Sequence, residues 1–247
     1  MTSTSQFLEA DDHPAAALRV LITGGTSGLG LAMVHELIRR SAHVAFVARS
    51  RDGIDRVLQQ HPTSHGIIGD VSNKDDIHPI AMQALGALGG LDVLINNASS
   101  LGPVPLQLLA DTECEDFEIA LETNLLGPFR LTKSLLGALA ASAREGQGAL
   151  VVNVSSDAAV NGYAQWGAYG ASKAALLHMT RIWRQELMDA EIQVLSFDPG
   201  DMDTPLHALA VPDADRSLLK RPEDAARELI EAIGAALSHR SARKVEA

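Results

Sequence analysis

Cysteine and basic residues are scarce in this sequence of 247 residues. A single cysteine, Cys114, means that no disulfide can form within the chain. A chain without disulfides suits a reducing compartment, and we expect it to be cytoplasmic. Only 20 Lys and Arg stand against 31 Asp and Glu, which gives a formal net charge of −11. Because so acidic a surface repels phosphate backbones, we expect no nucleic-acid partner.

Long hydrophobic runs are also missing. No apolar stretch approaches the roughly 20 residues that span a bilayer, so we expect no membrane partner. Residues 1–17 carry neither Lys nor Arg and no apolar segment typical of a signal peptide, and we expect them to form a flexible tail. The chain is 46% hydrophobic and has no Pro/Ser-rich linker, which predicts a single domain over residues 18–247.

Short apolar runs alternate with longer amphipathic segments along this domain. The short runs predict six strands, at 19–23, 43–48, 64–68, 91–96, 149–155 and 192–197. The longer segments predict six helices, at 28–41, 51–60, 72–88, 113–144, 168–190 and 222–237. Ser72 is the expected N-cap of the third helix, and Gly127-Pro128 is the expected bend in the fourth. The proline-containing segment 199–221 is predicted to be a loop or lid.

Strands that alternate with helices form βαβ units and predict a parallel sheet covered on both faces. Right-handed crossovers then give a doubly wound, Rossmann-like α/β fold with three α/β/α layers. Ligands of such open sheets bind at the carboxyl ends of the strands. Candidate functional residues are therefore sought where the predicted strands end.

A glycine-rich turn joins the first strand to the first helix. Its glycines form the pattern G-x-x-x-G-x-G, in which no Cβ keeps backbone N–H groups away from a pyrophosphate. This predicts a dinucleotide site, although a purely structural turn is the alternative. The residues expected at the site are Gly24, Thr26, Ser27, Gly28, Leu29 and Gly30.

The ends of the second and third strands predict which dinucleotide binds. Arg49 stands where an acidic residue would accept hydrogen bonds from the ribose 2′-OH of NAD. A guanidinium suits a 2′-phosphate, so Arg49, helped by Arg51, predicts NADP(H); a solvated surface arginine is the alternative. Asp70 and Val71 follow the third strand, where side chains are expected to meet the adenine.

Proton-transfer chemistry is indicated by Tyr169 and Lys173, which share one face of a predicted helix because they are four residues apart. A phenol with an ordinary pKa of about 10 is a poor base at neutrality, but a nearby ammonium lowers that pKa. Ser156 ends the fifth strand at the same edge of the sheet, where its hydroxyl can hold a substrate oxygen.

These motifs together resemble the short-chain dehydrogenase/reductase family, in its single-domain branch of about this length. The resemblance covers roughly residues 18–235. It rests on the glycine turn, on Ser156 thirteen residues before Tyr169-Gly-Ala-Ser-Lys173, on Asn96-Asn97-Ala98, on Asn124, and on Pro199-Gly200 followed by Thr204.

The resemblance implies an enzyme that transfers a hydride between NADP(H) and a small carbonyl or alcohol substrate. Tyr169 would be the general acid or base, Lys173 would lower its pKa and bind the nicotinamide ribose, and Ser156 would polarise the substrate oxygen. Asn124 would hold a water that links Lys173 to solvent. Further cofactor contacts implied by the resemblance are Asn96, Asn97, Pro199, Gly200, Met202 and Thr204.

Two features depart from the family's pattern. Ser99 stands where the family usually has the last glycine of Asn-Asn-Ala-Gly, and its Cβ is expected to shift the backbone near the nicotinamide. The chain also lacks the final strand and Gly-Gly turn that many relatives use in tetramers. We therefore expect a homo-oligomer in which a dimer, formed through helices 113–144 and 168–190, is favoured over a tetramer.

The substrate is not specified by the sequence. Its contacts are expected in 157–166, which includes Tyr163 and Trp166, and in 201–221, where the leucines and valine hint at an apolar compound; these are Leu206, Leu209, Val211, Leu218 and Leu219. Two other functions stay open: a non-redox epimerase or dehydratase on the same scaffold, and a non-catalytic NADP-sensing protein.

No metal site is expected. His61 and His65 are four residues apart, but Pro62 lies between them and no third ligand is near in the sequence.

Overall fold

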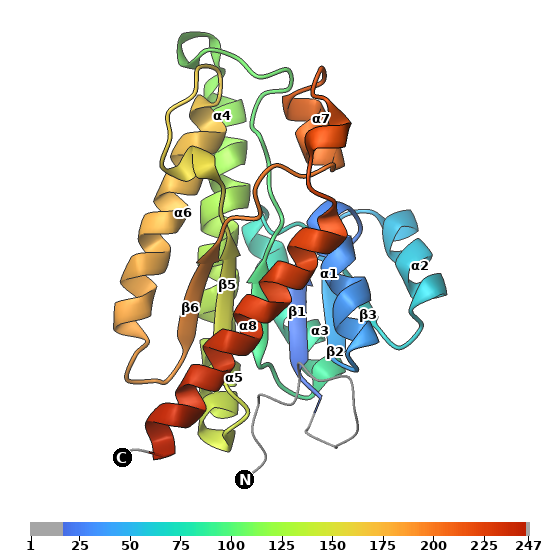
Figure 1. Cartoon of the computed structure of the whole chain (residues 1–247), viewed down its shortest axis with the longest axis vertical. Helices are drawn as coiled ribbons and strands as arrows, with labels where there is room; N and C mark the ends of the chain where they lie inside the picture. The colour runs from blue at the N-terminus through green and yellow to red at the C-terminus, as the bar shows by residue number, and fades with distance from the viewer. Residues whose placement is uncertain (1–16, 246–247) are drawn as a thin grey trace.

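A computed structural model describes residues 17–245, with side chains up to residue 238. Its centre is a six-stranded parallel sheet in the order β3-β2-β1-β4-β5-β6 (Figure 1). All six predicted strands are present; they are β1 (Arg19–Thr23), β2 (His43–Ala48), β3 (His65–Ile68), β4 (Val93–Asn96), β5 (Leu150–Val154) and β6 (Gln193–Phe197). The predicted tail, residues 1–17, lies outside the described residues except for residue 17.

Both faces of the sheet are covered by helices, as predicted. Successive residues of β1 face opposite sides: Val20 and Ile22 pack in one apolar core, and Leu21 packs in the other. The first core includes side chains of α1 (Gly28–Arg39), α2 (Arg51–Gln60) and α8 (Pro222–Val245). The second includes side chains of α3 (Lys74–Leu88) and α5 (Gly127–Glu145), with α6 (Gly167–Glu186) beside it. These two layers make the predicted three-layer α/β/α fold.

The N-cap of α3 differs from the prediction. Asn73, not Ser72, caps this helix, because the Asn73 side chain accepts a hydrogen bond from Asp75 N. The Ser72 hydroxyl instead donates to Asp70 Oδ1 at 2.7 Å. A serine that bonds backward in this way stabilises the turn after β3 and is not available as a cap.

The long helix predicted over 113–144 is interrupted. It consists of α4 (Cys114–Leu121), a π-helical segment η3 (Glu122–Leu126) and α5. The irregularity lies just before the predicted bend at Gly127-Pro128, and the proline occupies the first turn of α5, where its missing N–H costs nothing. Sequence periodicity predicts a continuous helix here because a π segment inserts only one extra residue into the helical repeat.

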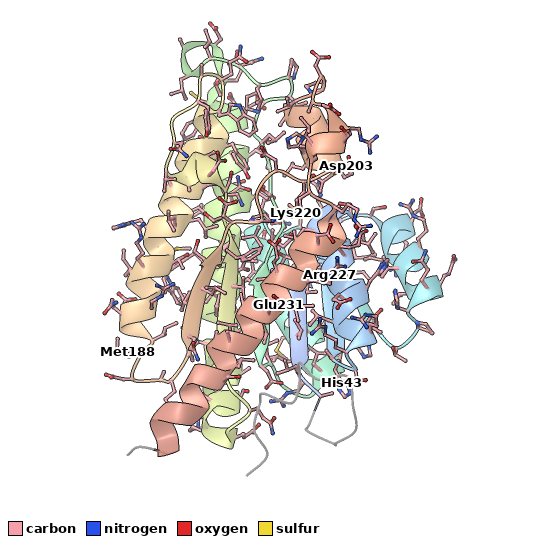
Figure 2. All side chains as sticks on the ribbon, viewed as in Figure 1. His43, Met188, Asp203, Lys220, Arg227 and Glu231 are labelled. Atoms are coloured by element: carbon pink, nitrogen blue, oxygen red, sulfur yellow. The ribbon has the colours of Figure 1, made fainter. Side chains whose placement is uncertain are left out.

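The predicted loop 199–221 contains a short helix, α7 (Pro205–Ala210), which is capped by the Thr204 side chain. The two ends of this lid are joined by a bridge between Met202 and Lys220 and by a hydrogen bond from Asp203 N to Lys220 O. Figure 2 shows Asp203 and Lys220 near the upper end of α8, which continues beyond the predicted end at residue 237. Backbone hydrogen bonds therefore hold the two ends of the lid side by side.

A partly buried ion pair joins Arg19 to Asp92 at the end of the sheet opposite the site. The Asp92 carboxylate accepts hydrogen bonds from Arg19 Nη2 at 2.7 Å and from Arg19 N at 2.8 Å, and the Ser142 hydroxyl also donates to it. Asp92 is almost fully buried, so its charge depends on these partners. The pair joins the start of β1 to the residue before β4 and to α5.

We predict that Asp92→Ala lowers the free energy of unfolding by about 3 kcal/mol, because Arg19 N, the partly buried Arg19 guanidinium and the buried Ser142 hydroxyl all lose their common acceptor. Glu145→Ala removes an exposed carboxylate 3.5 Å from the same arginine and is the matched control. The control is expected to cost less than about 1 kcal/mol. Urea unfolding measures both values, and equal losses in the two variants would contradict the assignment.

Candidate active site

The order of the strands reverses between β1 and β4, which is where open α/β sheets bind ligands. The glycine turn follows β1 at this point. Gly24 has φ +73° and Gly28 has φ +50°, a left-handed region that favours glycine. A Cβ on Gly30 would lie 2.1 Å from the Gly24 carbonyl oxygen, so the first turn of α1 packs directly against the glycine turn. The backbone therefore requires glycine at the three positions of the G-x-x-x-G-x-G pattern.

Asn97 fastens the glycine turn to the end of β4. Its Nδ2 donates to the carbonyl oxygens of Thr23 at 2.9 Å and Gly24 at 3.3 Å, and its backbone N–H donates to Thr23 Oγ1 at 3.0 Å. Asn97, predicted as a cofactor contact, thus has its amide group engaged in shaping the turn.

The Asn96 side chain, another predicted cofactor contact, points into the core. It is 3% exposed, and its Nδ2 donates to Asn153 Oδ1 at 2.8 Å. The alternation of side chains along extended backbone explains why Asn96, the last residue of β4, and Asn97, which follows it, face opposite sides. Val71 is also buried, within the core formed by α3 and α5, and its predicted contact with the adenine stays a prediction.

The start of α1 has the features of an anion-binding helix end. In the described structure the Ser27 side chain does not cap the helix, and its first turn holds no acidic residue. In contrast, Ser50 caps α2 and Asn73 caps α3, and both helices have aspartates in their first turn. The N-terminal end of α1 thus keeps its partial positive charge for an external group. A pyrophosphate fits this end, with Ser27 exposed beside it.

Arg49 lies at the end of β2 with its side chain 81% exposed. Its Nη1 makes a loose ion pair with Asp70 Oδ2, 3.9 Å away. Asp70 is held in place because its Oδ1 accepts hydrogen bonds from Ser72 N and Ser72 Oγ. The structure therefore brings the two residues together at the same edge of the sheet, with the guanidinium facing solvent.

Tyr169 and Lys173 are both buried in the first half of α6, with 8% and 2% of their surface exposed. Lys173 Nζ donates to the carbonyl oxygen of Val154 at 2.8 Å and lies 5.6 Å from the centroid of the Tyr169 ring. Trp166 packs edge-on against the same ring, with 5.7 Å between centroids. The predicted pair is thus placed at the carboxyl end of β5.

Burial has the largest effect on the pKa values of both Tyr169 and Lys173. It lowers the pKa of Lys173 to about 8, and the negative charge of Asp198 acts in the opposite direction. Burial also raises the pKa of Tyr169, whereas hydrogen bonding by the Ser156 side chain lowers it. The pKa of Tyr169 is therefore raised, where the sequence predicts that Lys173 lowers it. The prediction differs because spacing along a helix does not reveal how deeply the phenol is buried.

Ser156 precedes a short turn, η4 (Asp157–Ala159), that it caps. Its Oγ accepts from Ala158 N and donates to Asp157 Oδ1, both at 3.2 Å. The other oxygen of Asp157 accepts from the Tyr163 hydroxyl at 2.7 Å. The carboxylate of Asp157 thus orients Ser156 beside Tyr169 and holds Tyr163 over the same turn.

Asn124 lies in the π-helical segment η3 and is 1% exposed. Its Nδ2 donates to Ser100 O at 2.7 Å and to Ser172 Oγ at 2.8 Å. Its Oδ1 accepts from Ser100 N at 2.8 Å and from Ser99 Oγ at 3.1 Å. These four bonds use both amide hydrogens and place two donors on Oδ1, so the Asn124 side chain is fixed between the segment after β4 and α6; its role in holding a water stays a prediction.

The lid places Thr204, one of its predicted cofactor residues, against the glycine turn. A Cβ on Gly28 would lie 3.1 Å from the Thr204 methyl group, while Thr204 Oγ1 accepts from His207 N at the start of α7. Gly200 has φ +72° and follows the buried Pro199, and Met202 packs against the core beside α8. Leu206 and Ala210 of α7 pack near Tyr169. The lid therefore connects the glycine turn to the candidate catalytic tyrosine.

Two residues with a clear effect on this site were not singled out from the sequence. Asp198 acts on both Tyr169 and Lys173 through its charge, and Ser172 links Asn124 to the Tyr169 carbonyl oxygen through hydrogen bonds. Asp198 directly precedes Pro199-Gly200, and Ser172 lies within the segment from Tyr169 to Lys173. Their positions inside these motifs are the signal that could have identified them.

Among residues 17–245, no group of His, Cys, Asp and Glu is arranged to hold a metal ion. The His61 ring packs against His35, with 4.6 Å between centroids, while His65 is exposed at the start of β3. Within the same described range, no helix combines the length and apolarity that a membrane span requires. The oligomeric state remains a prediction; α5 and α6 expose the apolar side chains of Phe129 and Ile182.

Comparison with known proteins agrees with this geometry. The family model described as short chain dehydrogenase matches residues 18–215. L-fucose dehydrogenase of Mus musculus is 32% identical over 188 residues, which cover 76% of this chain and 66% of that protein. The chain belongs to the short-chain dehydrogenase/reductase family of oxidoreductases.

Two solved structures show the same architecture. The 3-ketoacyl-(acyl-carrier-protein) reductase of Brucella melitensis, complexed with NADH, has a TM-score of 0.80 and 25% identity, over 88% of this chain and 91% of that one. An actinorhodin polyketide ketoreductase with NADPH also has a TM-score of 0.80, with 26% identity over 89% of this chain and 92% of that one. A nicotinamide cofactor is therefore supported for this chain.

We predict that Lys173→Met stabilises the fold, because burying the ammonium opposes folding. At pH 7 the free energy of unfolding is expected to rise by at most about 3 kcal/mol, offset in part by the unpaired Val154 carbonyl. Between pH 8 and 10.5 the unfolded chain binds a proton that folded Lys173 has released, so the stability of the parent rises with pH there.

The pH-dependent rise is expected to be smaller in Lys173→Met than in the parent. Lys133→Met, which removes an exposed lysine of α5, is the control and should keep the rise. Chemical unfolding at a series of pH values measures it. An unchanged pH dependence in Lys173→Met would disprove the lowered pKa.

Proposed function

We propose that this protein is an NADP(H)-dependent carbonyl reductase or alcohol dehydrogenase that uses Tyr169 as general acid or base. The observation that carries the proposal is a buried tyrosine hydroxyl that interacts with Ser156, with buried Lys173 one turn further along α6. This group lies at the carboxyl edge of the sheet, which also carries the glycine turn. The family of the chain and its nicotinamide-bound structural neighbours support the proposal.

Tyr169 is suited to donate a proton. Because burial raises its pKa, the phenol is protonated near neutrality and can give its proton to the oxygen of a carbonyl substrate as that oxygen becomes an alcohol. Ser156, held by Asp157 and Ala158, would bind the same oxygen and orient it toward the phenol. The buried Lys173 ammonium would stabilise the phenolate that remains.

The cofactor would supply the hydride when bound. The glycine turn and the uncapped start of α1 would hold its pyrophosphate, and the exposed guanidinium of Arg49 would pair with a 2′-phosphate. Thr204 and the backbone of 199–202 would position the carboxamide, since the lid packs against Gly28. The substrate would then lie beside the Tyr169 hydroxyl, next to the apolar side chains of Trp166 and Leu206.

We predict that Tyr169→Phe abolishes turnover but leaves NADPH affinity near that of the parent, because only the proton donor is lost. General acid catalysis contributes about 10²–10⁴-fold, so kcat should fall by at least this order. A panel of ketones and aldehydes with NADPH identifies a substrate, and fluorescence titration measures the affinity. Tyr163→Phe, which alters the chain's other tyrosine but keeps the proton donor, should lose far less turnover than Tyr169→Phe.

The same assay separates redox chemistry from an epimerase or dehydratase that uses the cofactor transiently. A reductase consumes one NADPH for each product molecule, which lowers the NADPH absorbance in proportion to product. Turnover without net NADPH loss would favour the non-redox function. Full activity of Tyr169→Phe would refute the assignment of the tyrosine.

We predict that Arg49→Ala weakens NADPH binding by roughly 10–150-fold, which corresponds to the loss of a charge-assisted phosphate contact of about 1.5–3 kcal/mol. NADH binding should change little, since NADH has no 2′-phosphate. Arg56→Ala, on the exposed side of α2, is the control and should leave both affinities unchanged. If Arg49→Ala still strongly prefers NADPH over NADH, the proposed cofactor specificity is wrong.

A further inference from the structure

A carboxylate lies beside the arginine that is proposed to bind the 2′-phosphate. Arg49 Nη1 and Asp70 Oδ2 are 3.9 Å apart, and the two side chains are 81% and 36% exposed. The pair therefore lies at the surface, where a dissolved ligand reaches both charges. A ligand that binds Arg49 through a negative group must do so next to a second negative group.

The backbone of the sheet brings Arg49 and Asp70 together. Ala48 ends β2 and pairs in parallel with Ile68, which ends β3, and Gly69 N donates to Ala48 O at 3.1 Å. The hydrogen bonding between the two strands thus continues one residue beyond β3. Arg49 and Asp70 are the next residues along their segments, so they leave the sheet at neighbouring positions.

Hydrogen bonds fix the Asp70 carboxylate in this position. Its Oδ1 accepts from Ser72 N at 2.9 Å and from Ser72 Oγ at 2.7 Å. The backbone N–H of Asp70 donates to Asp76 Oδ2 at 2.8 Å, which ties the residue to the first turn of α3. The carboxylate is thereby held in place, with Oδ2 facing the guanidinium of Arg49.

The carboxylate of Asp70 and a phosphate of a ligand attract the same guanidinium. The Arg49 side chain is long and largely exposed, so it can turn toward a ligand, whereas the bonds to Ser72 keep Asp70 from following it. When Arg49 turns to a 2′-phosphate, its ion pair with Asp70 is weakened, and this loss offsets part of the new contact. A dinucleotide without a 2′-phosphate requires no such exchange.

We propose that Asp70 limits the preference of this protein for NADPH over NADH by competing with the 2′-phosphate for Arg49. The inference rests on the proposed function, in which Arg49 pairs with that phosphate. Asp70 is then a specificity-determining residue for the cofactor. The parent protein binds both dinucleotides, and it favours NADPH less strongly than Arg49 alone would allow.

Fluorescence titration of the full-length protein with NADPH and with NADH tests the proposal. In Asp70→Asn the ratio of the NADH Kd to the NADPH Kd should rise by about threefold, the order expected for the loss of an exposed ion pair. The amide keeps an oxygen for the two bonds from Ser72, and binding of NADH shows that the variant is folded. Contacts between residue 70 and groups common to both cofactors cancel in the ratio.

The double variant Arg49→Ala/Asp70→Asn separates competition for the arginine from direct repulsion of the phosphate. If Asp70 acts through Arg49, the two substitutions are coupled, and Asp70→Asn should no longer change the ratio once residue 49 is alanine. A threefold gain that persists in this background would overturn the proposal, because Asp70 would then act on the phosphate without the arginine.

Asp55→Asn is the matched control. Asp55 is an exposed carboxylate of α2, and within residues 17–245 it makes no ion pair with Arg49. Its replacement changes the net charge by the same amount as Asp70→Asn, yet it should leave the ratio of the two Kd values at the parent's. An equal gain in Asp55→Asn would attribute the effect to net charge and would contradict a specific role of Asp70.

The same titrations distinguish this inference from the proposed function. An unchanged ratio in Asp70→Asn, beside weakened NADPH binding in Arg49→Ala, would overturn the role of Asp70 and leave the proposed cofactor specificity intact. If Arg49→Ala keeps the parent's preference for NADPH, both fail, since Arg49 then does not bind the 2′-phosphate.

Discussion

The burial of a phenol and an ammonium side by side is the constraint on which this site depends. Tyr169 and Lys173 lie under the carboxyl end of β5, where the Val154 carbonyl is the hydrogen-bond partner of the ammonium. Removing both groups from water raises the pKa of one and lowers that of the other, so each is shifted toward its neutral form. The proton-donating phenol proposed here is a direct consequence of that burial, and the fold must be stable enough to tolerate it.

The sheet supplies that stability and also determines where ligands bind. Its buried strands pack between two layers of helices, and the ion pair of Arg19 with Asp92 fastens the edge that lies away from the site. The order of the strands reverses between β1 and β4. At the carboxyl ends of these two strands, the Asn97 side chain donates a hydrogen bond to Thr23 O and so joins β4 to the glycine turn. The ion pair therefore fastens the amino ends of β1 and β4, while the candidate site lies at their carboxyl ends.

Much of this arrangement was predictable because it depends on local patterns. The apolar runs predicted all six strands, with β1 and β2 at their observed bounds, since fully buried parallel strands read as continuous apolar segments. The glycine turn and the pair Tyr169 and Lys173 were recognisable for the same reason, because each motif lies within a few consecutive residues. The sequence by itself determined the six strands, their order along the chain and the local motifs that predict the candidate site.

Tertiary structure decided how those residues interact, because contacts between distant segments are not encoded in spacing. It turned Asn96 into the core, saturated the Asn124 amide, and buried Tyr169 deeply enough to raise its pKa. It also brought Ser99, which follows β4, within hydrogen-bond distance of the Asn124 amide, 25 residues further along the chain. The physical reason is that solvation and hydrogen-bond partners depend on the whole packed environment, whereas the sequence specifies only the groups that compete for them.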